Sequence, residues 1–267
     1  MLICVNKRWS NTVPAEPGEY KKLAKRDLIK CLHVINRCNK VKDADGFHEI
    51  IMDFASYIGF RYVIYFYSTA TYDSGYKINI INLSNPEKWM QEYAEGNFLA
   101  FDPVRKEMER RLKLNARLSF ILWDTYEAGL TPQEQEVIDR RRSYGLEYGC
   151  SVYDDSENRD FAFLVSFADK KHKPNEQTEL MCRLVINHLM TTRKRLDMLV
   201  LFSSLTRKEK DISEWLMKGK TNWEISKIIG ISENTVKFHI KNIFAKLCVT
   251  NRQQAVNVVL IAKYLSN

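Results

Sequence analysis

"GKTNWEISKIIGISENTVKFHIKNIFAKL", residues 219–247, decides the fold of the C-terminal part of this 267-residue chain. Thr221 and Glu224 have the spacing of a capping box, and Ser232 is a good N-cap for a second helix. The stretch therefore predicts a short helix, a brief turn and a longer helix, which is the helix-turn-helix arrangement. A further capping box at Thr206 predicts another helix before it.

The longer helix is predicted to have two different faces. Its apolar residues form one stripe at helical spacing: Val236, Ile240, Ile243 and Leu247. The residues that we expect to contact DNA lie on the opposite face and at the start of the preceding helix: Thr221, Asn234, Thr235, Lys237, Phe238 and Lys241. In a major groove, Lys can donate to guanine, Asn can pair with adenine and Phe can meet a thymine methyl group. The alternative is a solvated helix whose Phe238 belongs to a contact with a partner.

The distribution of charge supports DNA binding. Residues 205–267 hold eleven basic and five acidic residues, so they contribute +6 of the net charge of +8. A nearly neutral large domain with a small basic one attached is typical of a polyanion-binding module at the C-terminus. A basic surface that is merely solvated remains the alternative.

The last helical segment, "TNRQQAVNVVLIAKYL" (250–265), carries apolar residues on more than one side. Such a helix usually packs on its own domain and on a second surface. We expect that surface to be a second copy of the chain, in a homodimer. Paired recognition helices would then read half-sites about 10 base pairs apart.

The first part of the chain alternates helical and strand-like segments, so we expect an α+β protein. Strands are predicted at 61–68, 76–83, 149–155 and 159–169, and Asn85 is predicted to cap a helix that starts at Pro86. Helices on both faces of a mainly antiparallel sheet would form an α/β/α sandwich, followed by an all-α helix-turn-helix domain. The predicted domains are 1–198 and 205–267, with a linker at 199–204.

Several classes of protein are disfavoured by the composition. No apolar run approaches the roughly 18 residues of a membrane span, and "MLICVNKRW" is too short for a signal peptide, so we expect a cytoplasmic protein. The six cysteines include no C-x-x-C pair and the five histidines no H-E-x-x-H, so no metal site is predicted. We find no nucleophile with a matching base, so an enzyme is not favoured.

"KWMQEYAEGNFLAFDPV" (88–104) places a carboxylate, Asp102, among aromatic groups. Trp89 and Tyr93 are four residues apart and share one face of a helix, where they present an N–H and an O–H donor. An ionised Asp102 can only accept hydrogen bonds, so the stretch offers two donors and one acceptor. Core packing of the Trp/Tyr pair, and a turn or cap at the Asp-Pro, are the alternatives.

Two stretches carry a resemblance to a known family. Residues 219–247 closely resemble the DNA-binding domain of LuxR-type transcription factors. The pattern Trp89-x-x-x-Tyr93 with Asp102-Pro103, together with "YGLEYG" ending at Gly149, resembles the signal-binding domain of the quorum-sensing branch. The resemblance implies a small-molecule signal, an N-acyl homoserine lactone, and no other cofactor.

The resemblance also implies a role for each residue of the signal site. Trp89 would bind the lactone carbonyl, Tyr93 the acyl carbonyl and Asp102 the amide N–H. Trp123 is the candidate for a further family tryptophan, although the segment before it is longer than usual. Strand position adds Tyr65, Tyr67 and Ser166 to the expected wall of the site. Because these polar groups would be unpaired without ligand, we expect the empty domain to be poorly folded and the ligand to stabilise it.

The sequence thus predicts a ligand-dependent transcription factor of quorum sensing. Its expected partners are an autoinducer, double-stranded DNA with an inverted repeat, a second copy of the chain and RNA polymerase, with no membrane. The alternative is an orphan receptor of the same family that responds to a signal other than an acyl lactone.

Overall fold

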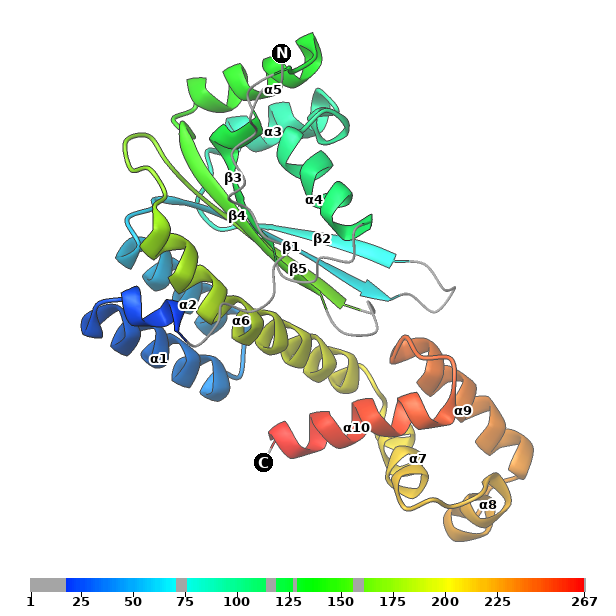
Figure 1. Ribbon diagram of the computed structural model, residues 1–267. Coiled ribbons are helices and arrows are strands. Elements are labelled where there is room, and N and C mark those ends of the chain that lie inside the picture. The colour runs from blue at the N-terminus through cyan, green and yellow to red at the C-terminus, as the bar shows by residue number, and fades with distance from the viewer. Residues whose placement is uncertain (1–17, 71–75, 114–118, 127–128, 156–160, 267) are drawn as a thin grey trace. The chain divides into compact units, whose positions relative to one another are not determined.

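The structure of the chain is a computed structural model, shown in Figure 1. It describes residues 18–70, 76–113, 119–126, 129–155 and 161–266. The chain divides into two compact units, a larger one that includes residues 78–190 and a smaller one that includes residues 191–266. The predicted α+β class is confirmed, because the larger unit combines a sheet with helices and the smaller one is helical.

The larger unit is built on a five-stranded sheet in the order β2-β1-β5-β4-β3. The strands are β1 (Tyr62–Ala70), β2 (Tyr76–Asn82), β3 (Ser119–Leu122), β4 (Tyr148–Asp155) and β5 (Phe161–Asp169). β4 pairs antiparallel with both of its neighbours, and Ser151 lies opposite Ser166 in that register. β3 was not predicted, since its four residues follow a strongly basic segment and are too few to show an alternating pattern.

Helices cover both faces of this sheet, as predicted for an α/β/α sandwich (Figure 1). One face carries α1 (Lys25–Lys40), preceded by the 3-10 helix η1 (Glu19–Lys22), α2 (Ala44–Tyr57) and α6 (Glu176–Ser203). The other face carries α3 (Glu87–Glu95), α4 (Pro103–Lys113) and α5 (Pro132–Ser143), with the 3-10 helices η2 (Phe98–Ala100) and η3 (Trp123–Tyr126).

Each face of the sheet has its own apolar core. Phe47 and Phe54 of α2 pack against Phe163 and Phe167 of β5, with ring centroids 6.3 Å and 6.0 Å apart. A second cluster lies under α3, α4 and α5: Trp89, Val104, Ile121, Trp123, Val137, Leu146 and Ala168. The second cluster surrounds the site described below.

Two local predictions for the larger unit need correction. The N-cap of α3 is Pro86 and not Asn85, because the backbone N–H and C=O of Asn85 are held in a turn by the side chain of Asn82. Residues 199–204, which were predicted to form a linker, are helical as far as Ser203. α6 runs through them to Ser203, because Leu201 and Phe202 pack against the core of the smaller unit and stabilise its last turn.

The smaller unit has the predicted helix-turn-helix arrangement. Its helices are α7 (Arg207–Met217), α8 (Asn222–Ile229), α9 (Glu233–Lys246) and α10 (Arg252–Ser266). The capping boxes at Thr206 and Thr221 form as predicted, and Ser232 caps α9 by accepting from the backbone N–H of Thr235. Gly230 ends α8 with φ of 68°, a left-handed conformation that glycine adopts readily.

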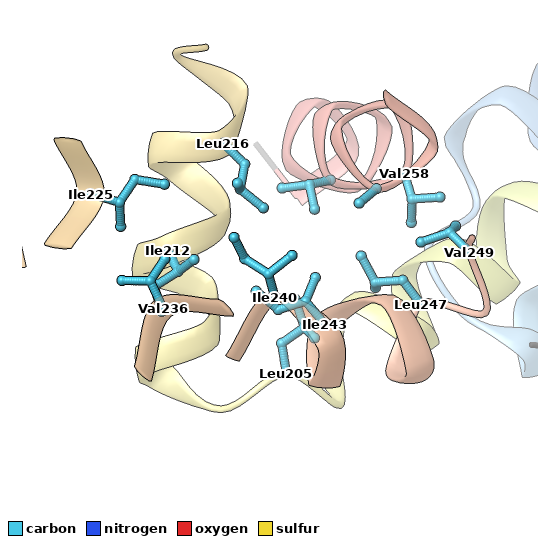
Figure 2. Close-up of a cluster of buried hydrophobic side chains, with 12 residues drawn as sticks. Leu205, Ile212, Leu216, Ile225, Val236, Ile240, Ile243, Leu247, Val249 and Val258 are labelled. Carbon is cyan, nitrogen blue, oxygen red and sulfur yellow. The ribbon is translucent and has the colours of Figure 1, made fainter. Parts of the chain in front are cut away.

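Figure 2 shows the core that these helices share. Val236, Ile240, Ile243 and Leu247 of the predicted stripe are all buried, together with Ile212 and Leu216 of α7 and Ile225 of α8. The predicted inward face of the recognition helix is therefore confirmed, and its opposite face is left in solvent.

Candidate ligand pocket and DNA-binding face

A small cavity of about 80 Å³ lies between the sheet and the helices α3, α4 and α5. Its lining includes five of the seven residues predicted for the signal site: Trp89, Tyr93, Asp102, Trp123 and Ser166. They come from α3, the residue before α4, the start of η3 and from β5, so the fold brings together residues that are far apart in sequence.

Trp89 and Tyr93 project from one face of α3, as their spacing predicts. Their rings meet edge to face with centroids 5.3 Å apart, and Phe98 stacks on Trp89 at 5.9 Å. Trp89 is buried, yet its indole N–H makes no hydrogen bond with the described part of the chain. An unpaired donor on a residue that lines a cavity favours a ligand that brings an acceptor.

Asp102 lies at the N-terminal end of α4, where it accepts two hydrogen bonds. Its Oδ1 accepts from the backbone N–H of Val104 at 2.8 Å, and its Oδ2 from the hydroxyl of Tyr93 at 2.8 Å. Burial and the neighbouring Asp102 carboxylate raise the pKa of Tyr93, because both disfavour a phenolate. Tyr93 therefore remains a donor at every physiological pH.

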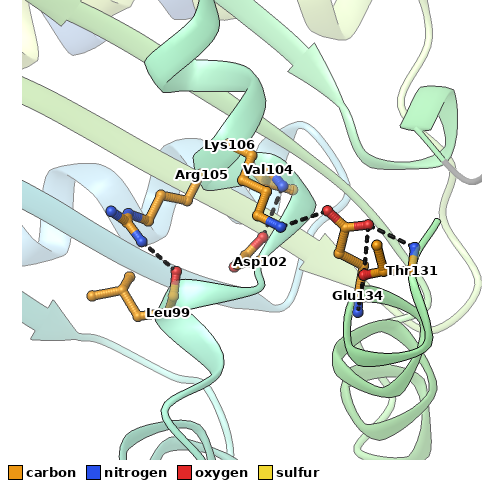
Figure 3. Close-up of polar contacts among 7 residues, drawn as sticks. All are labelled: Leu99, Asp102, Val104, Arg105, Lys106, Thr131 and Glu134. Carbon is orange, nitrogen blue, oxygen red and sulfur yellow. Dashed lines mark hydrogen bonds and ion pairs between the residues drawn. The ribbon is translucent and has the colours of Figure 1, made fainter.

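The cations near Asp102 are engaged elsewhere (Figure 3). Arg105 donates to the backbone carbonyl of Leu99 at 2.7 Å, and Lys106 donates to Glu134 of α5 at 2.7 Å. Among the described residues, no lysine or arginine forms an ion pair with Asp102. The carboxylate keeps its charge available to a ligand, since it has lone pairs beyond the two that are used.

Trp123 lies in the cavity despite the longer segment before it. Its indole N–H donates to Oγ of Ser151 at 2.9 Å, and this hydroxyl is 2.8 Å from that of Ser166. Gly149 explains how the indole fits, because a Cβ at this position would lie 2.5 Å from a ring carbon of Trp123. Only a glycine allows the strand backbone and the indole to approach this closely.

Tyr65 and Tyr67 do not line this cavity, contrary to the expectation for the wall. Tyr65 packs edge to face on Phe47 of α2 at 5.9 Å and bonds His48, and Tyr67 stacks on Tyr65. Successive side chains of a strand point to opposite faces, so the neighbouring residues of β1 face the cavity instead. These are Ile64 and Phe66.

Several further residues of the lining were not predicted. Arg141 of α5 is buried and lies over the ring of Trp123, with its guanidinium carbon 4.3 Å from the centroid. Ser151 and Asn85 add polar groups, while Ile64, Phe66, Ile80 and Met90 form an apolar wall. The predicted strand at residues 61–68 already implies that Ile64 and Phe66 share one face, because side chains alternate along a strand. Only the sheet order shows that this face meets α3.

The outward face of α9 is exposed as predicted. Asn234, Thr235, Lys237 and Lys241 are exposed, and Phe238 has 61% of its surface in solvent. Lys237 forms an ion pair with Glu233 one turn earlier at 2.9 Å. Thr221 is also exposed and caps α8. An exposed aromatic group between two lysines on one helix face is suited to a groove with phosphates at its edges.

Other kinds of site receive no support from the described residues. They contain no cluster of His, Cys, Asp or Glu that could hold a metal ion, and the cysteines among them are free thiols. None of the helices that the structure describes combines the length and the apolar character needed to cross a bilayer.

Two sequence profiles match the chain, one for each unit. The profile of the autoinducer binding domain matches residues 43–192, more than half of the chain. The profile described as "Bacterial regulatory proteins, luxR family" matches residues 203–259. The first match ends and the second begins within α6, and residues 193–202 lie between them.

Curated relatives match along much of their length. The transcriptional activator protein LuxR of Aliivibrio fischeri (strain ES114) is 31% identical over 249 residues, which cover 87% of this chain and 92% of the relative. The regulatory protein SdiA of Escherichia coli (strain K12) is 30% identical over 175 residues, 63% of this chain and 69% of the relative.

Solved structures share the fold. A crystal structure of Escherichia coli SdiA aligns with a TM-score of 0.53 at 24% identity and covers 89% of this chain and 98% of its own. SdiA in complex with octanoyl-rac-glycerol aligns with the same TM-score at 23% identity, covering 91% and 98%.

Proposed function

The chain belongs to the LuxR family of bacterial regulatory proteins, with an autoinducer-binding domain and a helix-turn-helix domain, and from this premise we propose that its signal is an N-acyl homoserine lactone. It is a DNA-binding transcriptional regulator and not an enzyme, as the sequence predicted. We further propose that it acts as a homodimer on an inverted-repeat site.

The observation that carries the proposed ligand is the polar arrangement of the cavity. The Trp89 indole N–H is a donor without a partner among the described residues, and the Asp102 carboxylate is an acceptor without an ion pair there. An acyl homoserine lactone offers the complement, because its lactone carbonyl accepts and its amide N–H donates. Trp89 would bind the carbonyl and Asp102 the amide N–H.

Tyr93 would change partner when the ligand enters. In the structure its single hydroxyl hydrogen is donated to Asp102. When the ligand amide takes its place at the carboxylate, this hydrogen becomes available to the acyl carbonyl. The exchange keeps every donor paired, so it costs little in hydrogen bonding.

The other residues would hold the lactone ring and the acyl chain. Trp123 would pack on the ring, and the apolar wall formed by Ile64, Phe66, Ile80 and Met90 would receive the chain. The cavity of about 80 Å³ is well below the roughly 300 Å³ at which ligand pockets begin. Binding would therefore move the helices α3, α4 and α5 outward and fill a new apolar volume.

The DNA-bound form would use α9 as the recognition helix of each copy. Exposed Leu260, Ile261 and Tyr264 on α10 offer an apolar surface for the second copy. Two recognition helices related by a two-fold axis would read half-sites about 10 base pairs apart, and RNA polymerase would be the partner at the promoter.

The proposed ligand can be tested by expressing the full chain with a mixture of acyl homoserine lactones. Small molecules extracted from the purified protein are then identified by mass spectrometry. We expect a lactone in near-stoichiometric amount with the wild type, and at least tenfold less with Trp89→Phe or Asp102→Asn. Purified protein that retains no lactone, with a melting temperature that no lactone raises, would contradict the proposal.

A second candidate is an orphan receptor for a signal that is not an acyl lactone. It is favoured by one observation, that the similar protein SdiA has been solved with octanoyl-rac-glycerol, an ester that has no amide N–H. A thermal-shift series with matched octanoyl compounds separates the two. A larger shift with octanoyl glycerol than with octanoyl homoserine lactone would favour the orphan receptor.

A further inference from the structure

Glu233 is the only acidic residue of α9, and neither the sequence nor the proposed function gives it a role. It stands at the first position of the helix that would enter DNA, and 41% of its side chain is in solvent. The outward face of this helix is otherwise neutral or basic: Asn234, Thr235, Lys237, Phe238 and Lys241. The phosphates of DNA repel a carboxylate in this place, so attraction to the DNA backbone does not explain it.

The start of α9 does not depend on this carboxylate. The N-cap is Ser232, whose hydroxyl accepts from the backbone N–H of Thr235 at 3.1 Å. In α8, by contrast, the carboxylate of Glu224 completes a capping box. The one polar partner of the Glu233 carboxylate among the described residues is the ammonium of Lys237.

Glu233 and Lys237 together present an acceptor beside a donor. Their Oε1 and Nζ atoms are 2.9 Å apart, and the two residues are neighbours on one side of the helix because they are one turn apart. Residues near the N-terminus of a recognition helix are the ones that reach base edges in the major groove. An ammonium has three hydrogens and a carboxylate has further lone pairs, so both groups can bind a base while they remain paired.

A C·G base pair presents the complementary pattern in the major groove. Cytosine N4 is a donor and guanine O6 is an acceptor, and the two atoms are about 2.9 Å apart because they are hydrogen-bonded to each other. An acceptor and a donor with the same spacing can therefore meet both atoms at once. Guanine N7, next to O6, is a second acceptor for the ammonium, and cytosine has no acceptor next to N4 on this edge.

An A·T base pair fits less well, although it also carries a donor and an acceptor. Adenine N6 lies next to N7, an acceptor that repels a carboxylate, and thymine O4 lies next to a methyl group that offers nothing to an ammonium. Adenine is matched instead by an amide side chain, which has both a donor and an acceptor. Replacing Glu233 with glutamine should therefore change the preferred base as well as the affinity.

We propose that Glu233 determines the sequence preference of the DNA-binding unit. Its carboxylate accepts from N4 of a cytosine in each half-site, while Lys237 donates to the guanine of the same base pair. This inference rests on the proposed use of α9 as the recognition helix and adds which base pair the helix reads. At a site with another base pair the carboxylate lacks a suitable donor and is repelled by the DNA, so Glu233 also excludes wrong sites.

The test begins with the selection of binding sites from a duplex library with a random centre. The full chain is expressed with a mixture of acyl homoserine lactones, and its affinities for the selected duplex and for single base-pair variants are measured by fluorescence anisotropy. We expect one C·G pair in each half-site whose replacement weakens binding of the wild type about tenfold. In Glu233→Gln this loss falls to about threefold or less, and A·T becomes the best replacement.

A second measurement separates base reading from a role in helix stability. We expect Glu233→Gln to bind a duplex of unrelated sequence more tightly than the wild type, because it removes a charge that the phosphates repel. A carboxylate that only offset the dipole of α9 would, on removal, weaken binding to every duplex by a similar factor. Asp211→Asn is the matched control, since it removes the same charge from an exposed residue of α7 and leaves the base preference unchanged.

Glu233→Asp keeps the negative charge at the start of α9 but shortens the side chain, so it also loses the preference for the C·G pair. A selected half-site without such a pair, or an equal loss at this pair in the wild type and Glu233→Gln, overturns this inference alone. The use of α9 as the recognition helix fails together with this inference in two cases. Either the wild type enriches no sequence, or Lys241→Ala binds the selected duplex as tightly as the wild type.

Discussion

Asp102 and Tyr93, two polar residues of the cavity, form a hydrogen bond with each other. The sequence argument expected both to be unpaired without ligand and the empty domain to be poorly folded for that reason. In the structure the phenol donates to the carboxylate, and the backbone of Val104 donates as well. Because the two groups already pair within the protein, we expect a ligand to stabilise the domain mainly by burying apolar surface and by pairing with Trp89.

The contribution of this pair can be measured with Tyr93→Phe. The change leaves a buried carboxylate with one donor fewer, so we expect the free energy of unfolding to fall by about 1.5 kcal/mol. Urea denaturation of the ligand-free protein gives this value. Tyr144→Phe is the control, since Tyr144 donates to Glu92 at 2.6 Å near the surface and the change should lower the free energy of unfolding less. Equal losses in the two variants would contradict the role of the buried pair.

Gly149 gives a second prediction for a single residue. In Gly149→Ala the new methyl group would overlap the ring of Trp123, which must shift and give up its bond to Ser151. We expect a loss of about 2 kcal/mol in the free energy of unfolding and at least tenfold weaker ligand binding. Gly18→Ala is the control, because a Cβ there meets no atom within 4 Å. An unchanged fluorescence of the tryptophans in Gly149→Ala would show that the ring had not moved.

Only those features of the site that depend on the spacing of nearby residues could be predicted from the sequence. The face shared by Trp89 and Tyr93 follows from helical geometry, and both line the cavity. The wall residues on β1 were assigned to the wrong face, since a strand alone does not show which side meets which helices. Arg141 and Asn85 were missed because a buried Arg on a basic helix, and an Asn before a Pro, have no distinctive local pattern.

At the scale of elements, α4 and α5 are tied together at their N-terminal ends beside the cavity. Lys106 donates to Glu134, which also completes the capping box of α5 with Thr131 (Figure 3). The hydrogen bond from Lys106 and the backbone N–H of Thr131 lower the pKa of Glu134 to about 2. A lowered pKa means that this carboxylate stabilises the fold only while it is ionised.

The sign of the pH dependence follows from this shift. The stabilisation is present above the ordinary pKa of a glutamate, near 4.5, and is lost as the pH falls toward 2. We expect Glu134→Gln to lower the free energy of unfolding by about 0.5 kcal/mol at pH 6 and to have no effect near pH 2. Urea denaturation across this range checks it. Glu136→Gln, an exposed residue of the same helix, should show no such pH-dependent difference.

Elements with strong boundary signals were predicted well. The capping boxes at Thr206 and Thr221 start helices where the sequence placed them. β3 was missed because its four residues carry no strand pattern of their own. It is a strand because it pairs with β4. The continuation of α6 was missed because its last turn is stabilised by packing on the other helices of the smaller unit.

The lysines of α9 give a prediction about DNA binding by one element. We expect Lys237→Ala and Lys241→Ala each to weaken binding to duplex DNA and to reduce the slope of log K against log salt by about one. Fluorescence anisotropy at several NaCl concentrations measures both effects. Lys263→Ala on α10 serves as control, because Lys263 lies outside the residues predicted to contact DNA. An unchanged slope in the α9 variants would show that these lysines do not contact DNA phosphates.

For the molecule as a whole, the exposed apolar side chains of α10 predict an interface between two copies. Leu260 and Tyr264 have 51% and 83% of their surface in solvent. We expect Leu260→Asp combined with Tyr264→Asp to raise the dimer dissociation constant at least tenfold while the helical content stays unchanged. Sedimentation equilibrium measures the constant, with Gln253→Asp on the same helix as control. A wild type that is monomeric at all concentrations would contradict the interface.

The apolar wall of the cavity has a practical consequence for making biosensors from this receptor. Ile64, Phe66 and Ile80 come from adjacent strands and their side chains have no hydrogen-bonding groups, so their size can be varied to admit longer or shorter signals. Gly149 offers no such freedom, because its missing side chain is the space that Trp123 occupies. A library for retuning the receptor should randomise the first three positions and leave the glycine untouched.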